Sequence, residues 1–214
     1  DLGGGHDMEF NVMLEKATSF HGHTCVGLVL GTRIAMAGLR KLGIKDPFKT
    51  RKLIVYVEID RCLADAIQAT TGCTIGKRTM KYMDYGKFAA TFVDTLRNRA
   101  VRLSVKEKAR KLAMKYGEEH GLIERGKKVS RKQEMKIMAE AYSKIRDVNL
   151  LDIRDVSVGI SKWDLPGLPE RKVMCAMCGE RIFDGREKIK DGRILCRPCA
   201  EGAYYRILGE TQQE

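Results

Sequence analysis

Three side chains that commonly bind metal ions stand at alternate positions in one short stretch, at His21, His23 and Cys25. On a helix, alternate residues lie roughly 200° apart, whereas in an extended segment they point to the same side. The three donors can therefore meet at one ion only if this segment is extended or looped. The alternative interpretation is a buried thiol and two loop histidines with ordinary hydrogen bonds.

A second stretch repeats this arrangement around another cysteine. The run Leu53–Ile59 is rich in β-branched residues and predicts a strand, after which a helix is expected to begin near Cys62. A thiol at a helix N-terminus is favoured as the thiolate. A glycine-punctuated loop with a third cysteine follows this helix. The candidates for chemistry are Cys25 and Cys62 as ligands or redox thiolates, Asp65 as an orienting residue, Cys73 as a reactive thiolate, and Lys77 as the cation that activates it.

These residues need elements that position them. The stretch from Cys25 to Gly43 predicts a helix, and its small residues Gly27, Gly31 and Ala35 would let another backbone pack closely against it. Residues 105–148 predict two further helices, beginning near Ser104 and Ser130. Strands are expected at 53–59, 79–85, 87–96, 100–105 and 153–163. Together they predict an α+β fold, with helices packed on a small, mostly antiparallel sheet.

The C-terminal part carries the strongest metal signature in the chain. The pair Cys175 and Cys178 is separated by seventeen residues from the pair Cys196 and Cys199. Two CxxC pairs at this spacing are typical of a structural zinc site, in which four thiolates close the coordination sphere. A proline- and glycine-rich stretch precedes them. We therefore expect a main domain over residues 1–165 and a zinc module over residues 170–214.

The blocks FHGHTCVG, RCLADAIQATTGCTIGK and the later DYGK resemble the FmdE family, which is named after formylmethanofuran dehydrogenase. That family usually has proline where this chain has Val26. The resemblance implies an α+β domain, commonly dimeric, with a Cys/His metal site and an association with a molybdenum or tungsten oxidoreductase. The knuckle, hairpin and following helix expected at the C-terminal cysteines resemble a zinc finger of the DksA/TraR type, a treble clef or zinc ribbon.

The overall composition bears on the cellular compartment and on the possible partners. Seven cysteines, without a secretory signal and mostly in metal-type motifs, indicate a reducing cytoplasmic compartment. No stretch of eighteen apolar residues is present, so no membrane partner is expected. The net charge of +12 is compatible with a nucleic-acid partner, although an ordinary solvated basic surface is the simpler explanation.

Three functions follow from these observations. The leading one is a zinc-binding FmdE-type protein, which can be an enzyme only if its metal keeps an open position. The second is a zinc-dependent nucleic-acid-binding or regulatory protein. The third is an accessory protein that docks with a larger oxidoreductase and catalyses nothing itself. In the main domain we predict a second divalent ion, zinc or another late first-row metal, bound by donors drawn from His21, His23, Cys25 and Cys62, with Cys73 in reserve.

Overall fold

The structure is a computed structural model that describes residues 3–50, 52–124 and 126–208. The chain divides into two compact units, the first running to Gly159 and the second starting at Ile160. We refer to them as the main unit and the C-terminal unit.

A five-stranded sheet forms one layer of the main unit. Its strands are β1 (Leu53–Val57), β2 (Met80–Tyr82), β3 (Ala89–Asp94), β4 (Arg99–Val105) and β5 (Leu151–Val156), in the spatial order β2-β1-β3-β4-β5. Only the β1–β2 pair is parallel; the other three pairs are antiparallel. The predicted α+β class with a mostly antiparallel sheet is confirmed.

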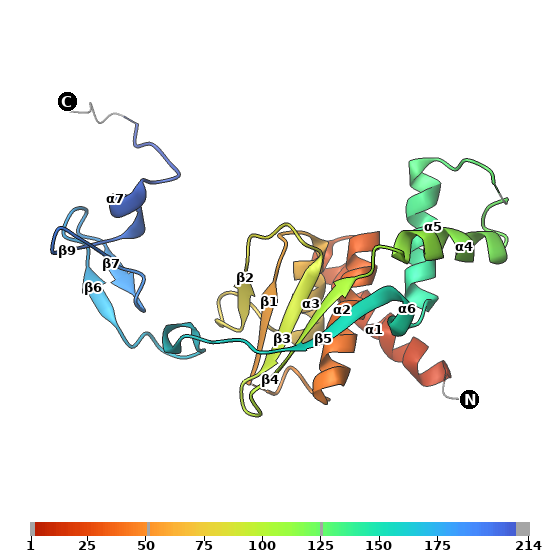
Figure 1. The fold of residues 1–214 in the computed structure, drawn as a ribbon, viewed down its shortest axis with the longest axis horizontal. Helices are drawn as coiled ribbons and strands as arrows, with labels where there is room; N and C mark the ends of the chain where they lie inside the picture. Colours follow the sequence, from red (N-terminus) through yellow and green to blue (C-terminus); the bar gives the residue numbers. More distant parts are fainter. Residues whose placement is uncertain (1–2, 51, 125, 209–214) are drawn as a thin grey trace. The chain divides into compact units, whose positions relative to one another are not determined.

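Three helices pack together beside this sheet: α1 (Gly3–His21), α2 (Val26–Leu42) and α3 (Cys62–Thr71). The central one, α2, contacts α1, α3 and strands β3 and β4 (Figure 1). It is buried along most of its length, and Leu28, Ile34 and Ala35 are fully enclosed. Gly43 ends it in the left-handed conformation, at φ 70°, that favours glycine. Helix α2 is thus the central packing element of the main unit.

The small residues of α2 are used inside the chain. A Cβ at Gly31 would lie 2.6 Å from the Cβ of Ala66 and 3.0 Å from the Cα of Leu63, both on α3. A Cβ at Gly27 would lie 3.1 Å from the Cβ of Cys62. These two glycines therefore let α2 and α3 approach closely, and they are not free to pack against a second copy of the chain.

The segment between β4 and β5 forms helices α4 (Ala109–Glu119), α5 (Arg131–Lys144) and the short α6 (Asp147–Leu150). Ser130 caps α5 in a capping box, with Gln133 as its partner. The predicted start at Ser104 is wrong, because Ser104 pairs with Asp152 in the sheet and Lys108 precedes the helix instead. The last strand also ends earlier than expected, at Val156.

Up to residue 208, the C-terminal unit contains these short elements: the 3₁₀ turn η1 (Lys162–Asp164), β6 (Lys172–Met174), β7 (Arg181–Phe183), β8 (Lys188–Lys190), β9 (Arg193–Leu195) and α7 (Arg197–Glu201). Strand β6 pairs with β7, and β8 pairs with β9. Its small core contains Ile182 and Leu195 together with Cys175 and Cys196. Within the described ranges of the chain, no helix has the length and apolar character to cross a bilayer.

Candidate metal centres

The His-x-His-x-Cys segment forms the junction between α1 and α2. His21 is the last residue of α1, and Gly22 turns the chain at φ 91°, in the region that favours glycine. Cys25, in an extended conformation, is the N-cap of α2, and its Sγ accepts a hydrogen bond from the Leu28 N–H at 3.3 Å. One donor atom from each of His21, His23 and Cys25 lies within 4.8 Å of the other two. The structure thus brings together the three residues that the spacing singled out.

Asp65 lies beside this cluster. His21 Nδ1 is 2.7 Å from Asp65 Oδ2, so the contact joins the end of α1 to the first turn of α3. Because an ionised carboxylate only accepts hydrogen bonds, Nδ1 is the donor, and in the neutral imidazole this leaves the lone pair on Nε2. This is the arrangement by which a carboxylate fixes the tautomer of a metal-binding histidine.

Cys62 is the first residue of α3 and contacts the same small apolar group as Cys25, formed by Ala17, Leu28 and Ala66. Burial, with a further contribution from the Cys25 thiol, raises the pKa of Cys62. Cys62 is therefore a neighbour of Cys25, but it is not one of the three residues whose donors all converge within 4.8 Å.

Cys73 and Lys77 do not join this site. Cys73 is 4% exposed, its thiol donates to the backbone oxygen of Leu53 at 3.7 Å, and burial raises its pKa. The ammonium group of Lys77 donates instead to the backbone oxygen of Gly72 at 3.2 Å. Burial outweighs the charge of Lys77 in setting the pKa of Cys73, so the structure gives no support to an activated thiolate here, and that expectation stays a prediction.

Two hydroxyl groups that sequence reasoning missed hold the loop in place. The side chains of Thr18 and Thr24 are hydrogen-bonded at 2.8 Å, and the Gly22 N–H donates to the backbone carbonyl oxygen of Thr18, also at 2.8 Å. Threonines are common in loops, so no sequence signal marked this pair. The helix that carries Thr18 was also missed, although Phe10, Leu14 and Ala17 recur at helical spacing.

The donor set suits a late first-row metal ion. Two imidazoles and a thiolate are the borderline and soft ligands that zinc prefers, and three protein ligands leave a fourth tetrahedral position for water or another group. An ion held by these residues would supply Lewis acidity and would favour the ionised form of a bound water. The residues present therefore fit such an ion, with Asp65 as the group that orients His21.

The four cysteines of the C-terminal unit form the second cluster. Donor atoms of Cys175, Cys178, Cys196 and Cys199 lie within 4.8 Å of one another, and the Cys178 and Cys196 sulfurs are 3.8 Å apart. Zn–S bonds of about 2.3 Å in a tetrahedron place two sulfurs about 3.8 Å apart, so this spacing matches zinc. Backbone N–H groups of Cys178 and Cys196 lower the pKa of Cys175 to about 6. These backbone N–H groups therefore favour the thiolate form of Cys175, which is the form that binds zinc.

The fold and these clusters define a metal-binding α+β protein with a C-terminal zinc finger. The chain belongs to the FmdE family, whose model, described as "FmdE, Molybdenum formylmethanofuran dehydrogenase operon", matches residues 20–152. Residues 169–205 match the prokaryotic DksA/TraR C4-type zinc finger. The resemblance seen in the sequence motifs is confirmed for both parts of the chain.

One solved structure and one curated protein extend the comparison. The crystal structure of a tungsten formylmethanofuran dehydrogenase FmdE-like protein from Syntrophus aciditrophicus has a TM-score of 0.59, with 22% identity. The match covers 92% of this chain and 95% of that one, and it supports the fold. A probable S-adenosyl-L-methionine-binding protein of Archaeoglobus fulgidus is 31% identical over 205 residues, 92% of this chain. The chain spans about half, 54%, of that relative's length.

Proposed function

We propose that the main unit binds one divalent ion, with zinc preferred, through His21, His23 and Cys25. The observation that carries this proposal is the convergence of their three donor atoms within 4.8 Å at the α1–α2 junction. The contact between His21 and Asp65 supports it, because it leaves Nε2 of His21 available for the ion. Cys62, beside Cys25, is the candidate for the fourth ligand of the ion. If Cys62 does not bind, the fourth coordination position is open to water or substrate.

Metal content per chain tests this proposal. The purified protein should contain about two ions, one for each cluster. Replacing the exposed His23 by alanine should remove one ion and leave the fold intact, as judged by circular dichroism. The matched variant Cys73→Ser alters a cysteine outside both clusters and should keep both ions. Two ions retained in the His23→Ala protein would overturn the proposed ligand set.

We further propose that the chain is an accessory protein of a molybdenum- or tungsten-containing oxidoreductase of the formylmethanofuran dehydrogenase type. The family membership and the name of the Syntrophus structure support this role. Affinity purification of the tagged chain from its own source should then recover molybdenum or tungsten with it. Recovery of the tagged chain alone, with neither element, would count against the accessory role and leave the metal centre unaffected.

The nucleic-acid-binding alternative has less support from the distribution of charge. From Ile160 to Glu214 the sequence has ten Lys and Arg residues and nine Asp and Glu residues, so the zinc-finger part is nearly neutral. A polyanion partner would instead require the main unit, which carries almost the whole excess charge. The absorbance ratio at 260 and 280 nm of the purified protein distinguishes the two functions, since bound nucleic acid would raise it.

Dimerisation through the main unit remains a proposal that rests on the family resemblance. The glycine positions no longer support it, because Gly27 and Gly31 pack against α3 of the same chain. Light scattering at micromolar concentration should give the mass of two chains.

A further inference from the structure

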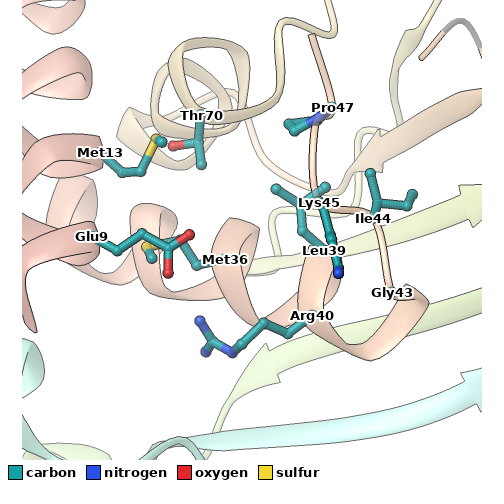
Figure 2. Close-up of a pocket in the computed structure, with 10 residues that line it drawn as sticks. All are labelled: Glu9, Met13, Met36, Leu39, Arg40, Gly43, Ile44, Lys45, Pro47 and Thr70. Carbon is teal, nitrogen blue, oxygen red and sulfur yellow. The ribbon is translucent and has the colours of Figure 1, made fainter. Parts of the chain in front are cut away.

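A pocket of about 340 Å³ opens at the end of α2 that is remote from Cys25. Helix α2 has 17 residues, so the two ends are about 25 Å apart at 1.5 Å per residue. Figure 2 shows Met13 entering the pocket from α1, Met36 and Leu39 from α2, and Thr70 from α3. A volume of this size is within the range of small-molecule sites. The proposed metal centre uses none of these residues.

The walls of the pocket are apolar and adaptable. Met36 and Leu39 are 7% and 8% exposed, and Met13 is half-buried opposite them. Methionine side chains are unbranched and polarisable, so they adjust to the shape of an apolar group. The body of a ligand that fits here is therefore hydrocarbon or thioether in character.

The polar groups of the pocket have opposite charges and lie on different sides. Glu9 extends from α1, and Lys45 extends from the loop after α2 on the other side (Figure 2). Neither has an ion-pair partner within the described part of the chain. Arg40, the other cation of the lining, already binds Asp147 at 2.5 Å. One carboxylate and one ammonium group thus remain available to a ligand.

The hydroxyl group of Thr70 is a second, independent observation that points to a ligand, because it lacks a hydrogen-bond partner among the described residues. Thr70 is 1% exposed, and its Oγ1 has no hydrogen-bond partner in the part of the chain that the structure describes. The adjacent Thr71 satisfies its own hydroxyl by donating to the Ile67 oxygen at 2.6 Å, so Thr70 differs from its neighbour. Buried hydroxyl groups are normally hydrogen-bonded, and a polar group of a bound molecule would satisfy this one.

We propose that this pocket binds a small zwitterion with an apolar body, of the class of apolar α-amino acids. Glu9 receives the ammonium group, Lys45 pairs with the carboxylate, and Thr70 hydrogen-bonds to one of the two. The methionine- and leucine-lined wall encloses the apolar side chain. A plain carboxylate would leave Glu9 unpaired and a plain amine would leave Lys45 unpaired, so the zwitterion is the ligand that matches both charges.

Isothermal titration of the full chain with L-leucine and L-methionine tests the proposal, with 4-methylpentanoate and isopentylamine as probes that lack one charge. Binding of either amino acid at millimolar concentration, with at least tenfold weaker binding of both single-charge probes, is expected. Glu9→Gln and Lys45→Gln should each weaken the binding of the amino acid by about tenfold or more, and Thr70→Val by about two- to tenfold. Glu15→Gln and Lys49→Gln, which change charges outside the pocket, should bind as the native chain does.

Amino acids also chelate metal ions, so the titration is repeated with the His23→Ala protein. Unchanged binding of leucine there assigns the site to the pocket, whereas its loss there, combined with native affinity in the three pocket variants, would overturn the proposal in favour of the metal centre. Failure of both amino acids to bind, equal binding of 4-methylpentanoate, or full affinity in all three pocket variants would each overturn it as well. Thr70→Val removes a hydroxyl that has no partner, so this variant is expected to fold.

Discussion

His21 Nδ1 and Asp65 Oδ2, 44 positions apart in the sequence, are 2.7 Å apart in the structure. The contact connects the last residue of α1 with the first turn of α3, and it sets the orientation of an imidazole beside His23 and Cys25. A carboxylate in this place fixes the imidazole in the tautomer that a metal ion requires.

The first prediction concerns this carboxylate. Asp65→Ala should weaken zinc binding at the main-unit site by about 10- to 100-fold, because His21 loses the group that orients it. Competition with a chromophoric chelator measures this affinity, and the C-terminal zinc should be unaffected. Asp155→Ala, which removes an exposed carboxylate on β5, serves as the control. Native affinity in the Asp65 variant would show that Asp65 has no part in metal binding.

A second prediction concerns the C-terminal unit. Cys196→Ser should release its zinc and make residues 172–201 sensitive to protease, while the melting of the main unit stays unchanged. The core of this unit is formed mainly by Ile182, Leu195 and the cysteines themselves, which is too little to hold it folded without metal. Cys73→Ser, which affects neither cluster, is the control for a cysteine change. Native protease resistance in the Cys196 variant would contradict the structural role of zinc.

The third prediction concerns the close approach of α2 and α3. Gly31→Ala should destabilise the main unit, because the new methyl group would meet Ala66 Cβ at 2.6 Å. Overpacking costs about 1–3 kcal/mol, whereas the gain in helix propensity is about 0.5–1 kcal/mol, so the clash should dominate. Urea denaturation measures the difference. Gly76→Ala, where nothing lies within 4 Å of the added methyl group, should be nearly neutral.

The fourth prediction gives a pH dependence. Burial raises the pKa of Cys73 above its ordinary value of 9.0, so the unfolded thiol loses its proton before the folded one does. This contribution to the free energy of unfolding is fully present below pH 9 and declines as the pH rises from there through the folded pKa. Cys73→Ala should therefore flatten the alkaline limb of the stability profile. An identical slope for the two proteins would show that Cys73 does not titrate as its burial predicts.

Thiol labelling of the metal-free chain provides a companion measurement. Cys73 should react with a thiol-specific disulfide reagent more slowly than Cys25, which is less buried. Mass spectrometry of the labelled peptides distinguishes the two sites. Faster labelling of Cys73 would instead support the hypothesis that Lys77 activates Cys73 as a thiolate.

The sequence was most informative where a local pattern and the tertiary structure agree. The β-branched run at Leu53–Ile59 and the helix beginning at Cys62 follow from periodicity, and so does the helix that ends at Gly43. The convergence of His21, His23 and Cys25 could be anticipated because only a non-helical path brings alternate donors together. The four-cysteine cluster follows from its spacing alone.

Other features depended on contacts that no local pattern contains. Ser104 and Glu107 are spaced as a capping box, yet Val105 pairs with Leu151 and the sheet continues past the expected helix start. The charge of Lys77 lies near Cys73 in sequence, but its ammonium group binds Gly72 while the thiol is buried. The pocket was not foreseen either, since Glu9, Lys45 and Thr70 come from three separate segments.

The three helices α1, α2 and α3 each reach both sites of the main unit. His21, Cys25 and Cys62 lie at their ends near the metal cluster, and Glu9, Gly43 and Thr70 line the pocket toward the opposite ends. Any free-energy coupling between the two sites must be reciprocal: if an occupant of the pocket strengthens zinc binding by some factor, zinc strengthens the binding of that occupant by the same factor. Two titrations, each performed with and without the other component, would therefore measure one coupling free energy, which these three shared helices would have to transmit.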